Sequence, residues 1–369
     1  MLYTVVPLLL SLLIGIYLYI VFRRPLRLLF GERGKILQRA GAAALAVLAA
    51  LAVTNIWGIR AAIVLHFAAF SVLTDIVRMI LKKAGRRPGR IIRILYSSCG
   101  IALFLTGAVF CYAYINMHTV LKKEYSISTQ KNIRAEGYRL LFLSDLHFGT
   151  TMDQEKLAEY CLRMEAEKPD LVILGGDIVD EATTLSQIWE VFSVLGQMDV
   201  PYGIYYVYGN HDKGRYSPEC DFTPEQLAET IEECKITILE DETVQINGEL
   251  TITGRRDLTD TRRSRTVRKS PETLLEDVPQ AAFHILADHQ PRGMEENAEA
   301  GYDLMLSGHT HAGQMWPVGL ITSLFDRETV NYGQKSFGDM ELIVSSGIAG
   351  WGYPFRTGKH CEFVVVEII

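Results

Sequence analysis

Residues 139–147 read RLLFLSDLH, an apolar run that stops at a serine, an aspartate and a histidine. The first five of these residues have the length and composition of a buried strand. The pattern returns at Leu171–Leu174, followed by GGD, and at Tyr202–Tyr208, followed by GNHD. Amphipathic stretches at Gln154–Glu167 and Leu185–Leu195 separate the three runs. This alternation of strands and helices predicts an α/β domain with at least one partly parallel sheet.

The chain beyond residue 208 continues this mixture of helices and strands. A helix is expected near Pro224–Cys234. Further strand-like runs are Ile236–Leu239, Val244–Ile246, Leu250–Ile252, Phe283–Ala287, Leu304–Leu306, Leu342–Ser346 and Phe363–Ile368. Polar residues cluster just past several of these runs, where open α/β sheets place their ligands.

Candidate metal ligands stand at five predicted strand ends. They are Asp145, His147, Asp177, Asn210, His289, His309 and His311. Carboxylate, imidazole and amide together form a borderline ligand set that suits manganese, zinc or iron. In an extended segment, the D-x-H and H-x-H spacings place both side chains of a pair on one side. The number of ligands exceeds that of one tetrahedral zinc and suits two divalent ions about 3.5–4 Å apart that share a carboxylate.

The first third of the chain is far more apolar than the rest. Four stretches approach the length of about 20 residues that spans a bilayer, near 4–22, 36–58, 60–80 and 94–115. The first lacks the basic start and small-residue cleavage site of a signal peptide, so a retained helix is preferred. Four such stretches in succession argue against a buried bundle in a soluble protein. We expect a transmembrane region over 1–116, a linker with a first strand over 117–137, and a catalytic domain over 138–369.

Basic residues predict the orientation of these spans. The first connection holds Arg23, Arg24, Arg27, Arg33, Lys35 and Arg39, and the third holds Lys82, Lys83, Arg86, Arg87, Arg90 and Arg93. The middle connection holds only Arg60. Positive charge marks cytoplasmic loops, so the domain after the fourth span is expected outside the cytoplasm. Near the cytoplasmic end of the third span, Asp75 and Arg78 stand three residues apart and are expected to pair on one helix face.

Composition adds a few exclusions. The net charge of −6 over 369 residues gives no global basic field for nucleic acid. The six cysteines show no CxxC pair. A bridge between Cys220 and Cys234 and free thiols are both open, and the sequence does not indicate an oligomeric state.

Five ordered motifs resemble those of the calcineurin-like metallophosphoesterase family. They are SDLHFG (144–149), GGDIVD (175–180), GNHD (209–212), DHQP (288–291) and GHTHAGQ (308–314). The resemblance runs from about Tyr138 to the end of the chain and is nearest to a membrane-attached bacterial branch of phosphodiesterases and lipid-pyrophosphate hydrolases. It implies two mixed sheets sandwiched between helices.

The resemblance also implies roles for the motif residues. Asp145, His147 and His311 would bind one metal, and Asn210, His289 and His309 the other. Asp177 would bridge the two ions. His211 would be a catalytic group rather than a ligand, paired with a catalytic Asp180, while Asp212 would support the loop. One departure is Ala312, where the family often has glycine; no loss of metal binding is expected.

Three features outside the ligands bear on the substrate. The basic stretch Arg255–Lys269 is either a solvated loop or a site for anionic headgroups. Trp316 and Trp351–Arg356 either form an apolar lip beside the metals or pack ordinarily. Arg356 would contact phosphate or be a surface cation.

A multi-span anchor favours a lipid or cell-envelope phosphoester, with membrane lipids as neighbours and no nucleic acid. The alternatives are a nucleotide or nucleic-acid phosphodiesterase, since the same metal core serves such relatives, and a membrane sensor that binds without turnover.

Overall fold

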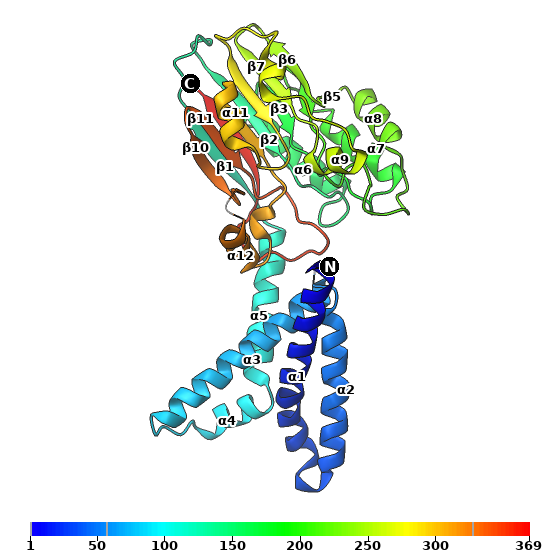
Figure 1. Ribbon diagram of the computed structural model, residues 1–369, viewed down its shortest axis with the longest axis vertical. Coiled ribbons are helices and arrows are strands. Elements are labelled where there is room, and N and C mark those ends of the chain that lie inside the picture. The colour runs from blue at the N-terminus through cyan, green and yellow to red at the C-terminus, as the bar shows by residue number, and fades with distance from the viewer. Residues whose placement is uncertain (1, 57, 327) are drawn as a thin grey trace. The chain divides into compact units, whose positions relative to one another are not determined.

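The computed structural model describes residues 2–56, 58–326 and 328–369, and its contacts divide the chain into two compact units, Met1–Ala113 and Tyr114–Ile369. The first unit is helical (Figure 1). Its elements are α1 Leu2–Phe30, the 3-10 helix η1 Glu32–Gly34, α2 Lys35–Val53, α3 Ile59–Lys83, α4 Arg90–Ser97 and α5 Gly100–Met117. Residues 114–117 of α5 belong to the second unit. Helices α1, α2, α3 and α5 are each long and apolar enough to cross a membrane.

Helix boundaries in this unit differ from the expected ones. The stretch near 94–115 is two helices, because the chain turns at Ser98 and Cys99, where Cys99 has a φ of 60°. The fourth apolar helix therefore begins at Gly100, and α4 is a separate short helix. Helix α1 continues to Phe30, so Arg23, Arg24 and Arg27 lie in its last turns rather than in a loop.

The expected pair of Asp75 and Arg78 is wrong. Asp75 accepts hydrogen bonds from Arg24 (2.6 Å), Tyr17 (2.9 Å) and Tyr96 (2.5 Å). Arg78 instead lies over the ring of Tyr96, with its guanidinium carbon 4.4 Å from the ring centroid. The contacts of Asp75 thus join α1, α3 and α4, which periodicity along one helix does not reveal.

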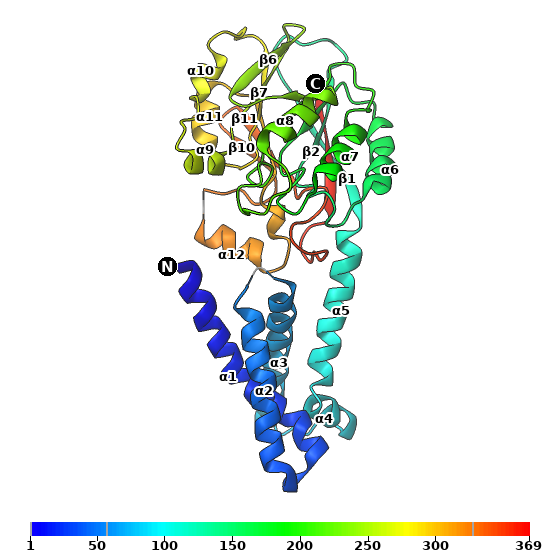
Figure 2. The ribbon, with the colours of Figure 1, turned by 90° about the vertical axis from the view of Figure 1, so that its right-hand side faces the viewer.

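The second unit contains two mixed six-stranded sheets, which confirms the expected fold (Figure 2). The first sheet has the order β1-β12-β2-β3-β4-β5. Its strands are β1 Val120–Ile127, β2 Tyr138–Leu143, β3 Leu171–Leu174, β4 Ile204–Tyr206, β5 Thr237–Ile238 and β12 Cys361–Ile368. Neighbouring strands in this sheet are parallel except for β12 and β2, which are antiparallel to each other.

The second sheet has the order β10-β11-β9-β8-β7-β6. Its strands are β6 Glu242–Ile246, β7 Leu250–Gly254, β8 Phe283–Ala287, β9 Leu304–Ser307, β10 Gly333–Phe337 and β11 Met340–Val344. The four central strands are parallel, and the hairpins at both edges are antiparallel.

Helices flank the two sheets. They are α6 Gln154–Glu165, α7 Leu185–Leu195, α8 Pro224–Glu233, α9 Leu258–Ser264, α10 Pro271–Leu275 and α11 Met294–Ala300. The short η2 His311–Gly313 carries a candidate ligand, and α12 Val318–Phe325 follows it and has no buried residue. The helix starts follow from local chemistry. Thr184 and Thr223 accept hydrogen bonds from the third helical amide of α7 and α8, and Gln187 and Gln226 complete each capping box.

Alternation along the strands builds the core on both faces of the first sheet. Leu140 and Phe142 of β2 point between the sheets and join a cluster with Ile285 of β8. Leu141 and Leu143 point the other way and pack in the cluster that includes the helices α6 and α7. Burying one such side chain contributes about 1.5–3 kcal/mol, so this pattern holds the strand register firmly.

The six cysteines are free thiols, so no bridge joins Cys220 and Cys234.

Candidate metal centre

The predicted ligands follow β2, β3, β4, β8 and β9, at the carboxyl ends of these strands. Strands β2, β3 and β4 are parallel neighbours in one sheet, and β8 and β9 are parallel neighbours in the other. Their carboxyl ends therefore meet at one edge of each sheet. Because the two sheets face each other across a shared core, the ligand loops of both converge.

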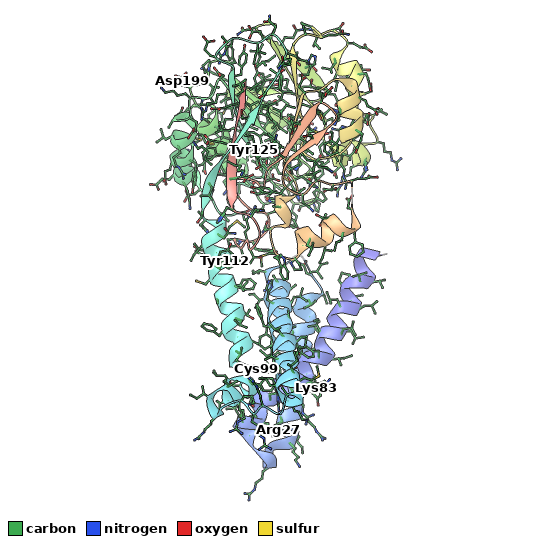
Figure 3. The ribbon with its side chains drawn as sticks, turned by 90° about the vertical axis from the view of Figure 1, so that its left-hand side faces the viewer. Arg27, Lys83, Cys99, Tyr112, Tyr125 and Asp199 are labelled. Carbon is green, nitrogen blue, oxygen red and sulfur yellow. The ribbon has the colours of Figure 1, made fainter. Side chains whose placement is uncertain are left out.

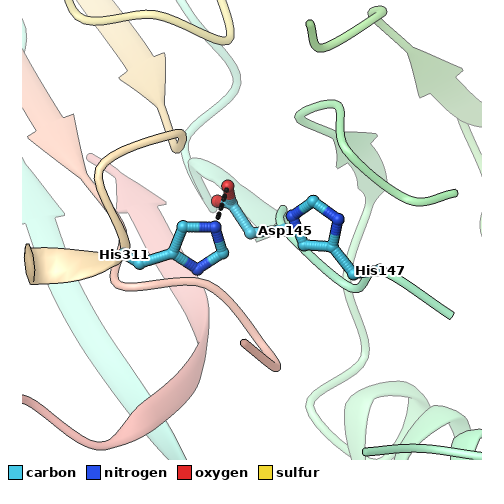
Figure 4. Close-up of side chains that lie close together, drawn as sticks. All are labelled: Asp145, His147 and His311. Carbon is cyan, nitrogen blue, oxygen red and sulfur yellow. Dashed lines mark ion pairs between the residues drawn. The ribbon is translucent and has the colours of Figure 1, made fainter. Parts of the chain in front are cut away.

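Asp145, His147 and His311 form the first group (Figure 4). Their potential ligand atoms all lie within 4.8 Å of one another. The closest pair is His311 Nε2 and Asp145 Oδ1, at 3.5 Å. The Asp145 carboxylate also accepts from the Ser144 hydroxyl (2.6 Å) and from the backbone amide of His309 (2.9 Å), which keeps it turned inward.

Asp177, His289 and His309 form the second group, again with ligand atoms within 4.8 Å. Asp177 Oδ2 lies 3.1 Å from His289 Nε2 and 3.7 Å from Nε2 of His147, a member of the first group. A single carboxylate oxygen thus stands between the two groups, which is the position a bridging ligand needs. Asn210 is buried, and its amide nitrogen contacts the Tyr216 hydroxyl at 3.4 Å.

Unpartnered polar atoms show that these residues fit a pair of metal ions. Nε2 of His147 and Oδ1 of Asn210 are buried without a hydrogen-bond partner among the described residues, and Nε2 of His289 faces only the Asp177 carboxylate. Leaving such atoms unpaired costs about 1–3 kcal/mol each unless something else satisfies them. Nδ1 of His289 contacts the Gly175 carbonyl at 2.8 Å, which orients the ring and directs Nε2 inward. The structure thus brings together two groups of predicted ligands, each of which could hold a divalent ion.

The backbone at the ligands is not extended, so the proposed reason for the D-x-H and H-x-H spacings is wrong. Asp145, His147, Asp177, His309 and His311 all have positive φ, between 40° and 69°. Such left-handed conformations cost about 1–3 kcal/mol each and concentrate at functional sites. Ala312 has a φ of 50°, which explains why relatives favour glycine there.

Two glycines allow the ligands to crowd together. A Cβ on Gly308 would collide with the Asp145 carboxylate, and one on Gly209 would collide with the Asp177 carboxylate. Any side chain at either position would displace a ligand.

Asp212 supports the loops around Asp177, as expected. Its carboxylate accepts hydrogen bonds from the backbone amides of Asp177 (2.8 Å), Ile178 (2.9 Å), Val179 (3.1 Å) and Gly209. One buried side chain thus ties the loop after β3 to the loop after β4.

His211 lies at the open side of the centre. Its ring centroid is 5.4 Å from that of His147, 4.8 Å from Tyr216 and 5.5 Å from Trp351. Of the two alternatives for Trp351, a lip beside the metals and ordinary packing, its contact with His211 supports the lip, and Tyr216 lies on the same ring. Trp316 is instead 67% exposed.

The expected pairing of His211 with Asp180 is wrong. Asp180 Oδ2 lies 3.1 Å from His147 Nδ1, while Glu181 Oε2 lies 2.9 Å from His211 Nδ1. The turn decides this, because the Ala182 amide donates to Asp180 Oδ1 and the Thr183 hydroxyl accepts from the Asp180 amide. Glu181, one residue later and one methylene longer, reaches His211. The only sequence signal was the presence of two adjacent acids after GGDIV.

Comparisons with known proteins place this domain in a family. Residues 138–313 match the family model of the calcineurin-like phosphoesterases. An uncharacterized metallophosphoesterase of Aquifex aeolicus is 27% identical over 72% of this chain and 98% of its own. The phosphodiesterase YaeI of Escherichia coli is 27% identical over 64% of this chain and 83% of its own.

The chain carries a calcineurin-like phosphoesterase domain. A Danio rerio transmembrane protein with a metallophosphoesterase domain is also similar, at 27% identity over 73% of this chain and 62% of that protein. Among solved structures, a dimetal phosphatase from Danio rerio covers 63% of this chain and 99% of its own, with a TM-score of 0.40 and 11% identity. The expected family is confirmed, and so is the expectation that the chain is a hydrolase.

Asp177 and His289 attract each other inside the phosphoesterase domain. Burial disfavours the charged forms of both Asp177 and His289, but their attraction outweighs it, so the pKa of Asp177 lies well below its usual range and that of His289 well above. Burial, followed by repulsion from His289, lowers the pKa of His309 to about 3. His309 is therefore neutral, which is the form that binds metal, whereas His289 would release its proton on binding an ion.

Two cations of the phosphoesterase domain are not where the sequence placed them. Arg356 is fully buried and donates to the carbonyls of Ser346 (2.7 Å) and Ala349 (2.6 Å). It is neither a phosphate contact nor a surface cation. Arg268 is also largely buried and pairs with Asp288 at 2.5 Å, beside His289. The stretch Arg255–Lys269 therefore includes structural cations and the helix α9, while Arg262, Arg263 and Arg265 remain exposed.

Glu181→Gln should move the alkaline limb of the pH–rate profile to lower pH by about one unit. Burial lowers the pKa of His211, but Asp177 and then Glu181 outweigh it and raise this pKa to about 9. A general acid acts while protonated, so activity falls as pH rises through its pKa, and losing the Glu181 charge brings that fall to lower pH. Steady-state kcat between pH 5 and 10 measures the shift.

Asp180→Asn is the matched comparison for Glu181→Gln. It should raise the metal concentration needed for half-maximal activity by about 10–100-fold, because Asp180 orients the ligand His147. An unmoved alkaline limb in Glu181→Gln would show that this residue does not tune His211.

Proposed function

We propose that this chain is a membrane-anchored phosphoesterase that uses two divalent ions, manganese, zinc or iron, on a lipid or cell-envelope substrate. The substrate class includes phosphodiesters, phosphomonoesters and pyrophosphates. The observation that carries the proposal is the oxygen of Asp177 that lies 3.1 Å from His289 Nε2 and 3.7 Å from His147 Nε2, between the two ligand groups. The family assignment supports the hydrolytic chemistry.

Each residue has a proposed task. Asp145, His147 and His311 hold one ion, and Asn210, His289 and His309 hold the other, with Asp177 between them. Bound ions would supply a nucleophilic water at neutral pH and neutralise charge on the phosphoryl oxygens. His211, kept protonated by Asp177 and Glu181, gives its proton to the leaving oxygen. Asp180 fixes the imidazole of His147.

Two features of the catalytic unit bear on a lipid substrate. A cavity of about 410 Å³ begins just after the ligand His147 and has a mixed lining, apolar at Phe148, Met152 and Tyr114 and polar at Asp153, Gln187 and Glu190. Its volume suits a small organic group. Helix α12, which follows the second H-x-H ligand, exposes an unusual apolar surface. Leu324 and Phe325 are 64% and 87% exposed.

The sidedness of the catalytic unit is proposed from the charges of the helical unit. Arg27 and Lys83, from its two basic segments, lie at the same end of that unit (Figure 3). By the positive-inside rule this end faces the cytoplasm, so a four-span anchor leads the catalytic unit to the outer side.

A substrate panel with the full chain tests the lipid preference. With manganese present, a lipid-linked phosphodiester in mixed micelles should give kcat/KM at least about tenfold above that of a water-soluble nucleoside phosphodiester. Leu320→Ser combined with Leu324→Ser should remove that advantage, because α12 then loses apolar surface for the micelle. Leu162→Ser with Leu185→Ser removes two exposed leucines elsewhere and should leave it intact.

A nucleotide phosphodiesterase is the second candidate. The guanidinium carbon of Arg263 lies over the ring of Tyr216, 3.9 Å from its centroid, and Tyr216 borders His211. A cation and an aromatic side chain beside the centre are groups that bind nucleotides. Turnover of the soluble nucleoside substrate that equals or exceeds that of the lipid ester would favour this candidate and reject the lipid preference.

A further inference from the structure

A cavity of about 710 Å³ lies inside the helical unit, between α3, the connection after it, α4 and the start of α5. Its volume is that of a ligand site. One wall is apolar and includes Leu73, Val77, Ile101 and Leu105. The other part of the lining is cationic, with Arg78, Lys82, Arg86, Arg87 and Arg93. The cavity thus joins an apolar slot to a concentrated positive charge.

The helical unit holds few acidic residues that could neutralise these cations. Glu32 and Asp75 are the only acidic residues in 1–113. Asp75 is already engaged by Arg24, Tyr17 and Tyr96. Among the described residues, no ion pair involves Lys82, Arg86, Arg87 or Arg93. Clustered cations repel one another, so an anion between them would be bound strongly.

Tyr96 connects the two parts of the lining. Its hydroxyl donates to Asp75, and its ring lies under the guanidinium of Arg78 at 4.4 Å. The ring therefore holds one cation in place beside the cavity. Helix α4 continues the same division, because Ile91 and Ile92 are 74% and 51% exposed and Arg93, which lines the cavity, follows them. A short helix of this kind suits the interface between acyl chains and headgroups.

We propose that this cavity binds one anionic phospholipid. The phosphate contacts the cations, and an acyl chain lies along the apolar wall. A free phosphate would leave the apolar wall unused, and a zwitterionic lipid would bring its own cation against five others. This ligand is distinct from the substrate of the phosphoesterase domain, and the inference rests on the proposed membrane anchor but not on hydrolysis.

Lipid titration of the full chain in a neutral detergent tests the proposal. Native mass spectrometry should show one phosphatidylglycerol bound at about tenfold lower concentration than phosphatidylcholine. Lys82→Gln with Arg93→Gln should abolish this preference. Val77→Trp, which fills the apolar slot, should weaken binding of phosphatidylglycerol by a similar factor. Glycerol phosphate at the same concentration should not displace the lipid.

The matched control is Lys83→Gln with Arg90→Gln, which removes the same charge from the same region outside the lining. It should keep the preference. Equal loss in both double variants, or no preference in the unaltered chain, would overturn the proposal, and displacement by glycerol phosphate would replace it with a simple anion site. Hydrolysis of a soluble phosphodiester, measured in parallel, reports the folded state of every variant. It also shows whether the proposed enzymatic function fails independently of lipid binding.

Discussion

Asp177→Asn should lower phosphodiester hydrolysis by about 1,000-fold or more and reduce bound metal from two ions to one or none. The amide has the size of the carboxylate but not its charge, so it cannot hold two cations through one oxygen. That oxygen lies 3.1 Å from His289 Nε2 and 3.7 Å from His147 Nε2, so both groups lose it together. Hydrolysis of bis-p-nitrophenyl phosphate and elemental analysis of the purified chain measure the two effects.

Asp199→Asn is the control for Asp177→Asn, since Asp199 is exposed on the same catalytic unit. It should change neither activity nor metal content. If the unaltered chain and Asp177→Asn hydrolyse the ester equally poorly while the former binds metal, a sensor that binds without turnover becomes the better account.

His211→Gln should lower kcat by about 100–10,000-fold on an alkyl phosphodiester while metal content stays unchanged. The imidazole lies beside both groups and its Nδ1 faces Glu181, so it is available as a proton donor without being a ligand. The loss should be smaller by about 100-fold on a p-nitrophenyl ester, because that leaving group needs little protonation.

The comparison of the two esters distinguishes acid catalysis from a positioning role for His211. Equal losses on both esters would contradict the acid role and point to phosphate binding. His360→Gln, at an exposed position of the same unit, should leave both rates unchanged.

Much of the metal centre was predictable from the sequence because ligand chemistry is carried by residue type and by position after a buried run. Leu171–Leu174 and Phe283–Ala287 were predicted as strands with the bounds they have, and Asp177 and His289 follow them. The pairing of Glu181 with His211 was not predictable. The side chains of two adjacent acids point in different directions, and the local turn decides which of them reaches a given histidine. Here the turn is fixed by the hydrogen bonds of Asp180 with Ala182 and Thr183.

The burial of Arg356 is a second feature that the sequence did not predict. Arg356 follows an aromatic, glycine-rich segment that gives no sign of its burial, yet its guanidinium donates to the carbonyls of His311, Ser346 and Ala349. Such satisfaction depends on where distant loops end in space, which no local pattern encodes.

The sequence by itself determined the apolar helices, the alternation of strands and helices, and the identity of every proposed metal ligand. Periodicity, burial preference and ligand softness are properties of residues and their neighbours, so they can be read along the chain. Only the tertiary structure decided that Asp180 faces His147 and that Glu181 faces His211. It also decided that five cations surround an apolar cavity, because each arrangement depends on segments far apart in sequence that meet only when the chain folds.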